Sequence, residues 1–220
     1  MRYRIASWLA CLSLLLSAAA YAGQPVIYIQ PLEPAPGAKV VSAVVAGLRA
    51  FFPVEVHVLP AAPLPKAAFY PARHRWRAER LLNWLQSHAP ADAKKIVGLT
   101  SADISTQKDD VEDWGVLGLG SLDGRACVLS SYRARRGVPV QVELARMAKI
   151  AVHEVGHTFG LEHCATAGCL MEDARGKVKT VDGEDDLCPA CRRQLHTGGV
   201  EVPGVVRRPW GTKPVDADPR

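Results

Sequence analysis

The stretch "HEVGHTFGLEHC", from His153 to Cys164, limits most strongly what this chain can fold into, because it concentrates polar groups that are costly to bury. If the apolar run before it forms a helix, His153 and His157 lie one turn apart on the same face. Their ring nitrogens can then approach one point, and zinc takes such ligands at about 2.0–2.1 Å. Glu154 lies beside that point, where it can hold a water molecule and accept its proton. The spacing therefore predicts a metal site on this helix.

The third histidine, His163, requires the helix to end before it. In a continuous helix, His163 would lie about 15 Å from His153 along the axis, too far to share an ion. Gly160 can end the helix, because a residue without Cβ adopts the left-handed conformation that turns the chain. His163 can then return as a third ligand and leave one position open, as is typical of a catalytic zinc. The alternative is three surface histidines that share no metal.

The N-terminal 22 residues have the features of a secretory signal. Two arginines precede an apolar stretch from Ile5 to Leu16, and the small-residue sequence "AYA" ends at Ala22. We expect cleavage after Ala22, export to the periplasm or the medium, and no stable membrane association of the mature chain. Two alternatives are a retained anchor, for which the apolar stretch is shorter than about 20 residues, and lipidation at Cys11.

Charge argues against a nucleic-acid partner. Loss of Arg2 and Arg4 with the signal lowers the formal net charge from +5 to +3. The basic clusters "RHRWR" (Arg73–Arg77) and "RARR" (Arg133–Arg136) belong to no recognisable binding motif, so we expect them to be solvated faces.

Hydrophobic periodicity predicts an α/β chain with a single domain. Apolar residues at helical spacing predict helices over Val41–Phe52 and Ala78–Leu85. Short β-like runs begin at Val26, Val54, Lys95, Val116 and Ala126. Because helices and strands alternate, we expect a largely parallel sheet. The proline content of Pro60–Pro71 predicts a loop.

The helix that carries the histidines is predicted to begin near Pro139, since proline is tolerated in a first turn. Its apolar stripe at helical spacing would pack on the sheet, and His153 and His157 on the adjacent face would line a cleft. The stripe consists of Ala148, Ala151, Val152, Val155 and Phe159.

Four of the six cysteines form two close pairs. Cys11 leaves with the signal, and Cys127 lies in a predicted strand, where a small apolar residue is expected. The remaining four, in C-x4-C and C-x2-C spacing, suit a four-thiolate zinc site. They are Cys164, Cys169, Cys188 and Cys191. In an oxidising compartment two crossed disulfides are the alternative, whereas a Cys188–Cys191 disulfide would close a tight ring typical of redox-active pairs.

The order of these motifs resembles that of the archaemetzincins, a family of zinc metallopeptidases in the metzincin clan. The similarity is most specific in "HEVGHTFGLEHC", in "CLM" (169–171) and in "CPAC" (188–191). Weaker similarity, for example in "GLTSADIS" and "WGVLGLGSLDGRACVLSSYR", extends it over about Val26 to His196.

The resemblance implies a role for each matching residue. His153, His157 and His163 would bind the catalytic zinc, with Glu154 as the general base. Met171 would occupy a tight turn beneath that metal. Cys164, Cys169, Cys188 and Cys191 would bind a second, structural zinc.

The resemblance also implies an α/β (α+β) metzincin-like fold. We expect a twisted, mixed, mostly parallel sheet of about five strands, with "VLGLG" (116–120) as an antiparallel edge strand that can bind an extended peptide. We expect residues 23–197 to form the protease domain, with a long active-site helix in an N-terminal subdomain to about residue 160. Residues 161–197 would form a small C-terminal subdomain with the Met-turn, and residues 198–220, rich in Pro, Gly and charge, a flexible tail.

These expectations describe a zinc-dependent peptidase that acts as a monomer on peptide or protein substrates. Two alternatives use the same residues. One is an exported binding module that zinc stabilises and that has no catalytic activity. The other is a zinc hydrolase of non-peptide amides, because the same metal, water and glutamate serve any acyl carbon.

Overall fold

A mixed β-sheet forms the centre of the molecule in the computed structural model, which describes residues 24–204 and 206–211. The strand order is β2-β1-β6-β10-β9, with β3 also paired to β1. All pairs in this sheet are parallel except β9 with β10. The strands are β1 (Val26–Glu33), β2 (Glu55–Val58), β3 (Ala62–Pro63), β6 (Ala93–Thr100), β9 (Gly118–Gly120) and β10 (Ala126–Ser130). The predicted mixed sheet with an antiparallel edge strand is confirmed, whereas the predicted signal segment lies outside the described residues.

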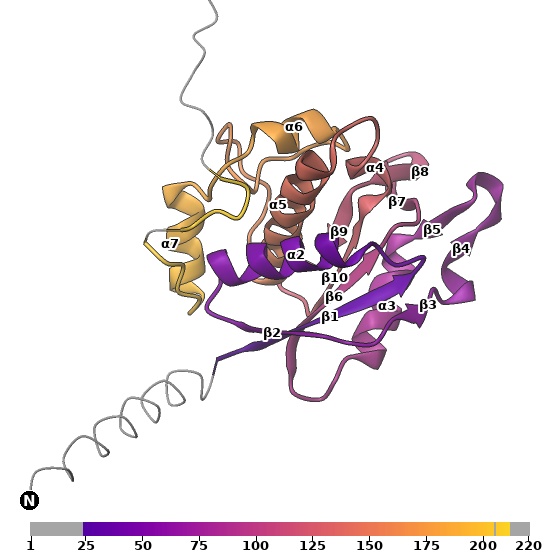
Figure 1. Cartoon of the computed structure of the whole chain (residues 1–220), viewed down its shortest axis with the longest axis horizontal. Coiled ribbons are helices and arrows are strands. Elements are labelled where there is room, and N and C mark those ends of the chain that lie inside the picture. Colours follow the sequence, from indigo (N-terminus) through magenta and orange to yellow (C-terminus); the bar gives the residue numbers. More distant parts are fainter. Residues whose placement is uncertain (1–23, 205, 212–220) are drawn as a thin grey trace, which may run out of the picture.

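Helices cover both faces of this sheet (Figure 1). Helices α2 (Ala38–Phe51) and α5 (Val140–Thr158) pack on one face, and α3 (Ala78–His88) packs on the other. Alternation along β10 explains the two cores, because Leu129 points into the core under α2 and α5 while Val128 points into the core under α3. Strands covered on both sides are largely apolar, as in β10, where every residue is buried and four of the five are apolar.

Helix α5 has the bounds that the sequence predicts. Pro139 is its N-cap residue, and the helix ends at Thr158. Gly160 follows with a φ of +87°, a left-handed conformation that a residue with a Cβ rarely adopts. At Gly47, helix α2 approaches α5 so closely that a Cβ there would lie 2.9 Å from the carbonyl oxygen of Ala148. Helix α5 is therefore held against α2 by close helix–helix packing.

A second sheet, with strand order β4-β5-β7-β8, was not predicted by periodicity. Its strands are β4 (Phe69–Tyr70), β5 (Arg75–Arg77), β7 (Ile104–Lys108) and β8 (Val111–Val116). The segment 60–71 is accordingly not only a loop, because two of its residue pairs form β3 and β4. The "VLGLG" run is also divided, since Val116 ends β8 and only Gly118–Gly120 form the edge strand.

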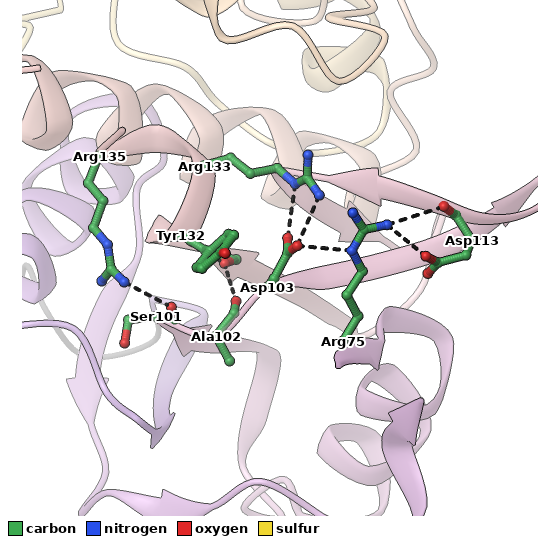
Figure 2. Close-up of polar contacts among 9 residues, drawn as sticks. Arg75, Ser101, Ala102, Asp103, Asp113, Tyr132, Arg133 and Arg135 are labelled. Carbon is green, nitrogen blue, oxygen red and sulfur yellow. Dashed lines mark hydrogen bonds and ion pairs between the residues drawn. The ribbon is translucent and has the colours of Figure 1, made fainter. Parts of the chain in front are cut away.

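The prediction that both basic clusters are solvated faces is wrong for Arg75 and Arg133. Both guanidinium groups bind the carboxylate of Asp103, at 3.0 Å for Arg75 and 2.9 Å for Arg133 (Figure 2). Arg75 also binds Asp113 in β8 at 2.7 Å. These ion pairs join the second sheet to the short helix α4 (Ser131–Ala134).

The C-terminal region contains α6 (Val178–Gly183) and α7 (Pro189–Thr197). The described residues after Gly198 form no helix or strand, yet their apolar side chains pack on the main core. Trp210 stacks on Phe51 with a centroid distance of 5.5 Å, and Arg208 pairs with Asp185 and Asp186 at 2.8 and 2.9 Å. Within the described ranges, no helix is both long and apolar enough to cross a bilayer.

Candidate metal centre

The structure brings the three predicted histidine ligands to one point. His153 and His157 project from the same face of α5, and their Nε2 atoms lie 3.0 Å apart. His163 follows the turn at Gly160, and the three rings offer ligand atoms that all lie within 4.8 Å of one another. His153 is buried and His163 is exposed, so the shared point lies at the boundary between the core and solvent.

Backbone carbonyls determine which ring nitrogens carry protons. Nδ1 of His153 lies 2.7 Å from the Leu170 oxygen, and Nδ1 of His157 lies 2.6 Å from the Leu161 oxygen. A carbonyl only accepts, so both Nδ1 atoms donate. Burial lowers the pKa of His157 and lowers the pKa of His153 to about 3, which keeps both rings neutral. Two Nε2 lone pairs therefore face each other at 3.0 Å, an arrangement that a shared cation relieves, as in histidine-ligated zinc sites.

Glu154 lies beside this point on α5, with only 6% of its surface exposed. Its carboxylate accepts a hydrogen bond from the backbone N–H of Gly120 in β9. Burial, with a smaller contribution from the nearby carboxylate of Glu184, raises the pKa of Glu154 to about 8. In a site without bound metal, this carboxyl group is thus a stronger base than an exposed glutamate.

The histidines and Glu154 line a cavity of about 590 Å³. Helix α5 and the edge strand β9 form two of its walls, and strands β7 and β8, the segment 173–176 and α6 complete the lining. Sequence reasoning missed three of its polar or aromatic residues, Trp114, Asp173 and Glu184. The segments around them have no clear periodicity, so no local pattern marks them.

Met171 is fully buried beneath α5. A Cβ on Gly156, between the two helical histidines, would lie 2.7 Å from the Met171 sulfur. The backbone oxygen of Met171 accepts a 2.7 Å hydrogen bond from the N–H of Cys164. Gly156 therefore lets the methionine contact the helix directly below the metal-binding face.

The four cysteines of the two close pairs also converge. Their sulfurs lie 3.7 Å apart in Cys164–Cys188, 3.7 Å in Cys169–Cys191 and 3.6 Å in Cys188–Cys191. A tetrahedron of sulfurs at 2.3 Å from zinc has edges of about 3.8 Å, whereas a disulfide requires about 2.05 Å. The observed spacing fits four thiolates around one ion, and all four cysteines are free.

Comparisons with known proteins agree with this geometry. Residues 44–197 match the family model described as Peptidase family M54. The archaemetzincin of Haloquadratum walsbyi is 34% identical over 160 residues, which cover 69% of this chain and 88% of the relative. The crystal structure of the archaemetzincin from Methanopyrus kandleri superposes with a TM-score of 0.70 at 25% identity and covers 80% of this chain and 97% of that one. The archaemetzincin from Archaeoglobus fulgidus, solved with malonate, gives a TM-score of 0.66 at 29% identity, with coverage of 77% and 99%.

A mixed sheet of this topology, with a helix that carries two convergent histidines, defines the class of the protein as zinc metallopeptidase, a hydrolase of peptide or protein substrates. Within that class, the chain belongs to Peptidase family M54, the family of the archaemetzincins.

Proposed function

We propose that Glu154 is the general base for hydrolysis of a peptide bond at a zinc ion held by His153, His157 and His163. The observation that carries this proposal is the convergence of three imidazoles beside one buried carboxylate in a cavity. When bound, zinc polarises the scissile carbonyl and lowers the pKa of water toward about 7. Glu154 accepts the proton of the attacking water and later delivers it to the leaving amine.

The unpaired edge of strand β9 is evidence that the substrate is a peptide. Gly118–Gly120 pair with β10 on one side only, since β9 is the last strand in the order of its sheet. The strand also lines the cavity next to Glu154. An extended peptide can therefore add to this edge through main-chain hydrogen bonds and present its scissile carbonyl to the histidines.

Glu154→Gln tests this role. The amide keeps the size of the side chain but accepts no proton, so we expect retained zinc and a kcat lower by about 10²–10⁴-fold. Zinc would be quantified by elemental analysis, and turnover would be followed on a peptide library. Glu143→Gln, in the first turn of the same helix, is the matched control and should cleave as the wild type does. Undiminished turnover in Glu154→Gln would exclude the role.

We propose further that Cys164, Cys169, Cys188 and Cys191 bind a second, structural zinc, and that Met171 occupies the tight turn below the catalytic one. The sulfur spacing supports the first assignment, and the contact of Met171 with Gly156 supports the second. Two zinc ions per chain and four thiols released on denaturation with chelator are expected. Fewer than four such thiols would favour disulfides.

The signal-like N-terminus leads us to propose an exported protein without stable membrane association, and we propose separately that it is a monomer. The compartment is the periplasm or the medium, and cleavage follows Ala22. N-terminal sequencing of the protein recovered from these fractions should begin at Gly23. An intact Met1 would contradict the proposal.

A further inference from the structure

A second carboxylate, that of Glu184, lines the same cavity as the histidines and Glu154. Glu184 directly follows α6 and is only 1% exposed. Its Oε1 atom is buried and has no hydrogen-bond partner among the described residues. Leaving a buried carboxyl oxygen without a partner is costly, so such a group in a cavity wall indicates a ligand that supplies the missing donor.

The charged groups around Glu184 are mostly acidic. The neighbouring carboxylates of Glu172 and Asp182 raise its pKa, and Lys149 acts in the opposite direction. Lys149 donates to the backbone oxygens of Glu184 and Val181, at 2.6 and 3.2 Å. Burial is the largest cause that raises the pKa of Glu184 to about 8, and it outweighs the opposing effect of Lys149. The site thus favours a neutral carboxyl group when empty and favours a carboxylate when a cation is bound.

Apolar side chains form part of the same cavity lining, beside polar residues that include Lys108 and Arg175. Ile150 lies one turn before His153 and Glu154 on the same face of α5, so the cavity extends from the metal-binding face toward α6. Val181 and Leu117 line the same cavity. A long side chain could pack its methylene groups on these residues and place a polar head at Glu184.

From this geometry we propose, on the basis of the function proposed above, that the cavity binds a lysine or arginine side chain next to the scissile bond, with Glu184 as its counter-ion. The ammonium or guanidinium group donates charge-assisted hydrogen bonds to the carboxylate. The substrate class is therefore peptides with a basic residue beside the bond that is cleaved. Glu184 determines the preference for a basic residue in the substrate and takes no part in proton transfer.

Two peptides test the proposal. One has lysine beside the cleaved bond and the other has norleucine, which keeps the methylene chain without the ammonium group. For the wild type, kcat/KM should be about 10- to 100-fold higher for lysine. In Glu184→Gln this ratio should fall to about 1–3. Glu172→Gln is the matched control. Glu172 is a neighbouring carboxylate that does not line this cavity, so the variant should keep the wild-type ratio. A wild-type ratio near 1, or an unchanged ratio in Glu184→Gln, would overturn the proposal.

Peptide binding to Glu154→Gln separates this proposal from the proposed function. Binding would be measured by isothermal titration calorimetry. Tighter binding of the lysine peptide without any cleavage by the wild type would leave the pocket assignment standing and remove the hydrolytic one. Cleavage without a preference for lysine would leave the hydrolytic function standing and remove the pocket assignment. If Glu184→Gln does not fold, Glu184→Asp retains the charge at a shorter reach and should lower the ratio only in part.

Discussion

Two glycines of β9 determine where the carboxylate of Glu154 lies. A Cβ on Gly118 would lie 2.5 Å from the Oε1 atom of Glu154, and a Cβ on Gly120 would lie 2.6 Å from its backbone oxygen. Neither distance leaves room for a side chain. The strand can therefore lie directly on α5 and donate the Gly120 N–H to the carboxylate only because both positions are glycine.

Gly118→Ala should move this carboxylate while leaving the histidines in place. We expect zinc content to remain at the wild-type value and kcat to fall by about 10- to 100-fold, because small displacements of a catalytic group are costly. Gly37→Ala is the control, since a Cβ there meets nothing within 4 Å. Equal kcat values for the two variants would show that Glu154 tolerates the added methyl group.

The raised pKa of Glu184 predicts a pH-dependent stability. In the unfolded chain this carboxyl ionises near its ordinary value of 4.5, but in the folded protein its pKa is about 8. Its contribution to stability is therefore complete below pH 4.5 and is lost as the pH rises toward 8. Between pH 5 and 9 the free energy of unfolding of the wild type should fall by on the order of 1–3 kcal/mol more than that of Glu184→Gln. Urea unfolding across this range measures the difference, and parallel profiles would contradict it.

Local patterns in the sequence were sufficient to predict that three imidazoles converge, because His153 and His157 follow from helical spacing and His163 from the glycine turn. The role of Glu154 stays a prediction. Glu184 could not be predicted in this way. It reaches the cavity through the packing of α6 against α5, which no local pattern encodes.

Among the elements, the second sheet is held by charge as well as by apolar contacts (Figure 2). Asp103 lies between β6 and β7, and both Arg75 and Arg133 bind its carboxylate. Arg75 continues to Asp113 in β8, the strand that carries Trp114 to the cavity wall. The ion pairs therefore link the position of this wall to α4 and, through it, to the main sheet.

Asp103→Asn should loosen the cavity wall without touching α5. Two half-buried guanidinium groups would lose their shared carboxylate, so we expect a loss of about 1–3 kcal/mol in the free energy of unfolding. On the function proposed above, KM for peptides should rise more than kcat falls, because the wall would contact the substrate while Glu154 keeps its position. Asp110→Asn, an exposed position in the same hairpin, is the control. A change in kcat without a change in KM would contradict this prediction and would show that the ion pairs affect the catalytic step.

Periodicity recovered the large elements and missed the small ones for a physical reason. Periodicity in the sequence reflects which side chains are buried. Continuous apolar faces are buried by strands β1, β6 and β10 and by helices α2, α3 and α5. Strand β8 has no fully buried residue, and β5 consists of two arginines around one tryptophan. Strands β7 and β8 pair as a short hairpin, and β4 and β5 are only two and three residues long, so the small sheet has little apolar periodicity to report.

In the whole molecule, the two candidate metal sites are joined by residues that are adjacent in the sequence. His163 and Cys164 are adjacent, and the cysteine cluster joins the segment after α5 to the start of α7. The residues after α7 return to the core through Trp210, which stacks on Phe51. If the four cysteines bind zinc as proposed, that site would also fix the position of His163 and anchor the C-terminal region.

Metal removal should therefore occur in two distinguishable steps. The histidine site has neutral ligands and opens to a cavity, so a mild chelator should abolish activity while leaving the melting temperature close to that of the intact protein. Removal of the second ion leaves four thiols around an empty centre, and the melting temperature should fall by more than about 10 °C. His163→Gln should reproduce the first state and Cys188→Ser the second, with Trp210 fluorescence reporting whether the C-terminal segment remains packed. A Cys188→Ser variant that melts at the wild-type temperature would show that this anchor needs no metal.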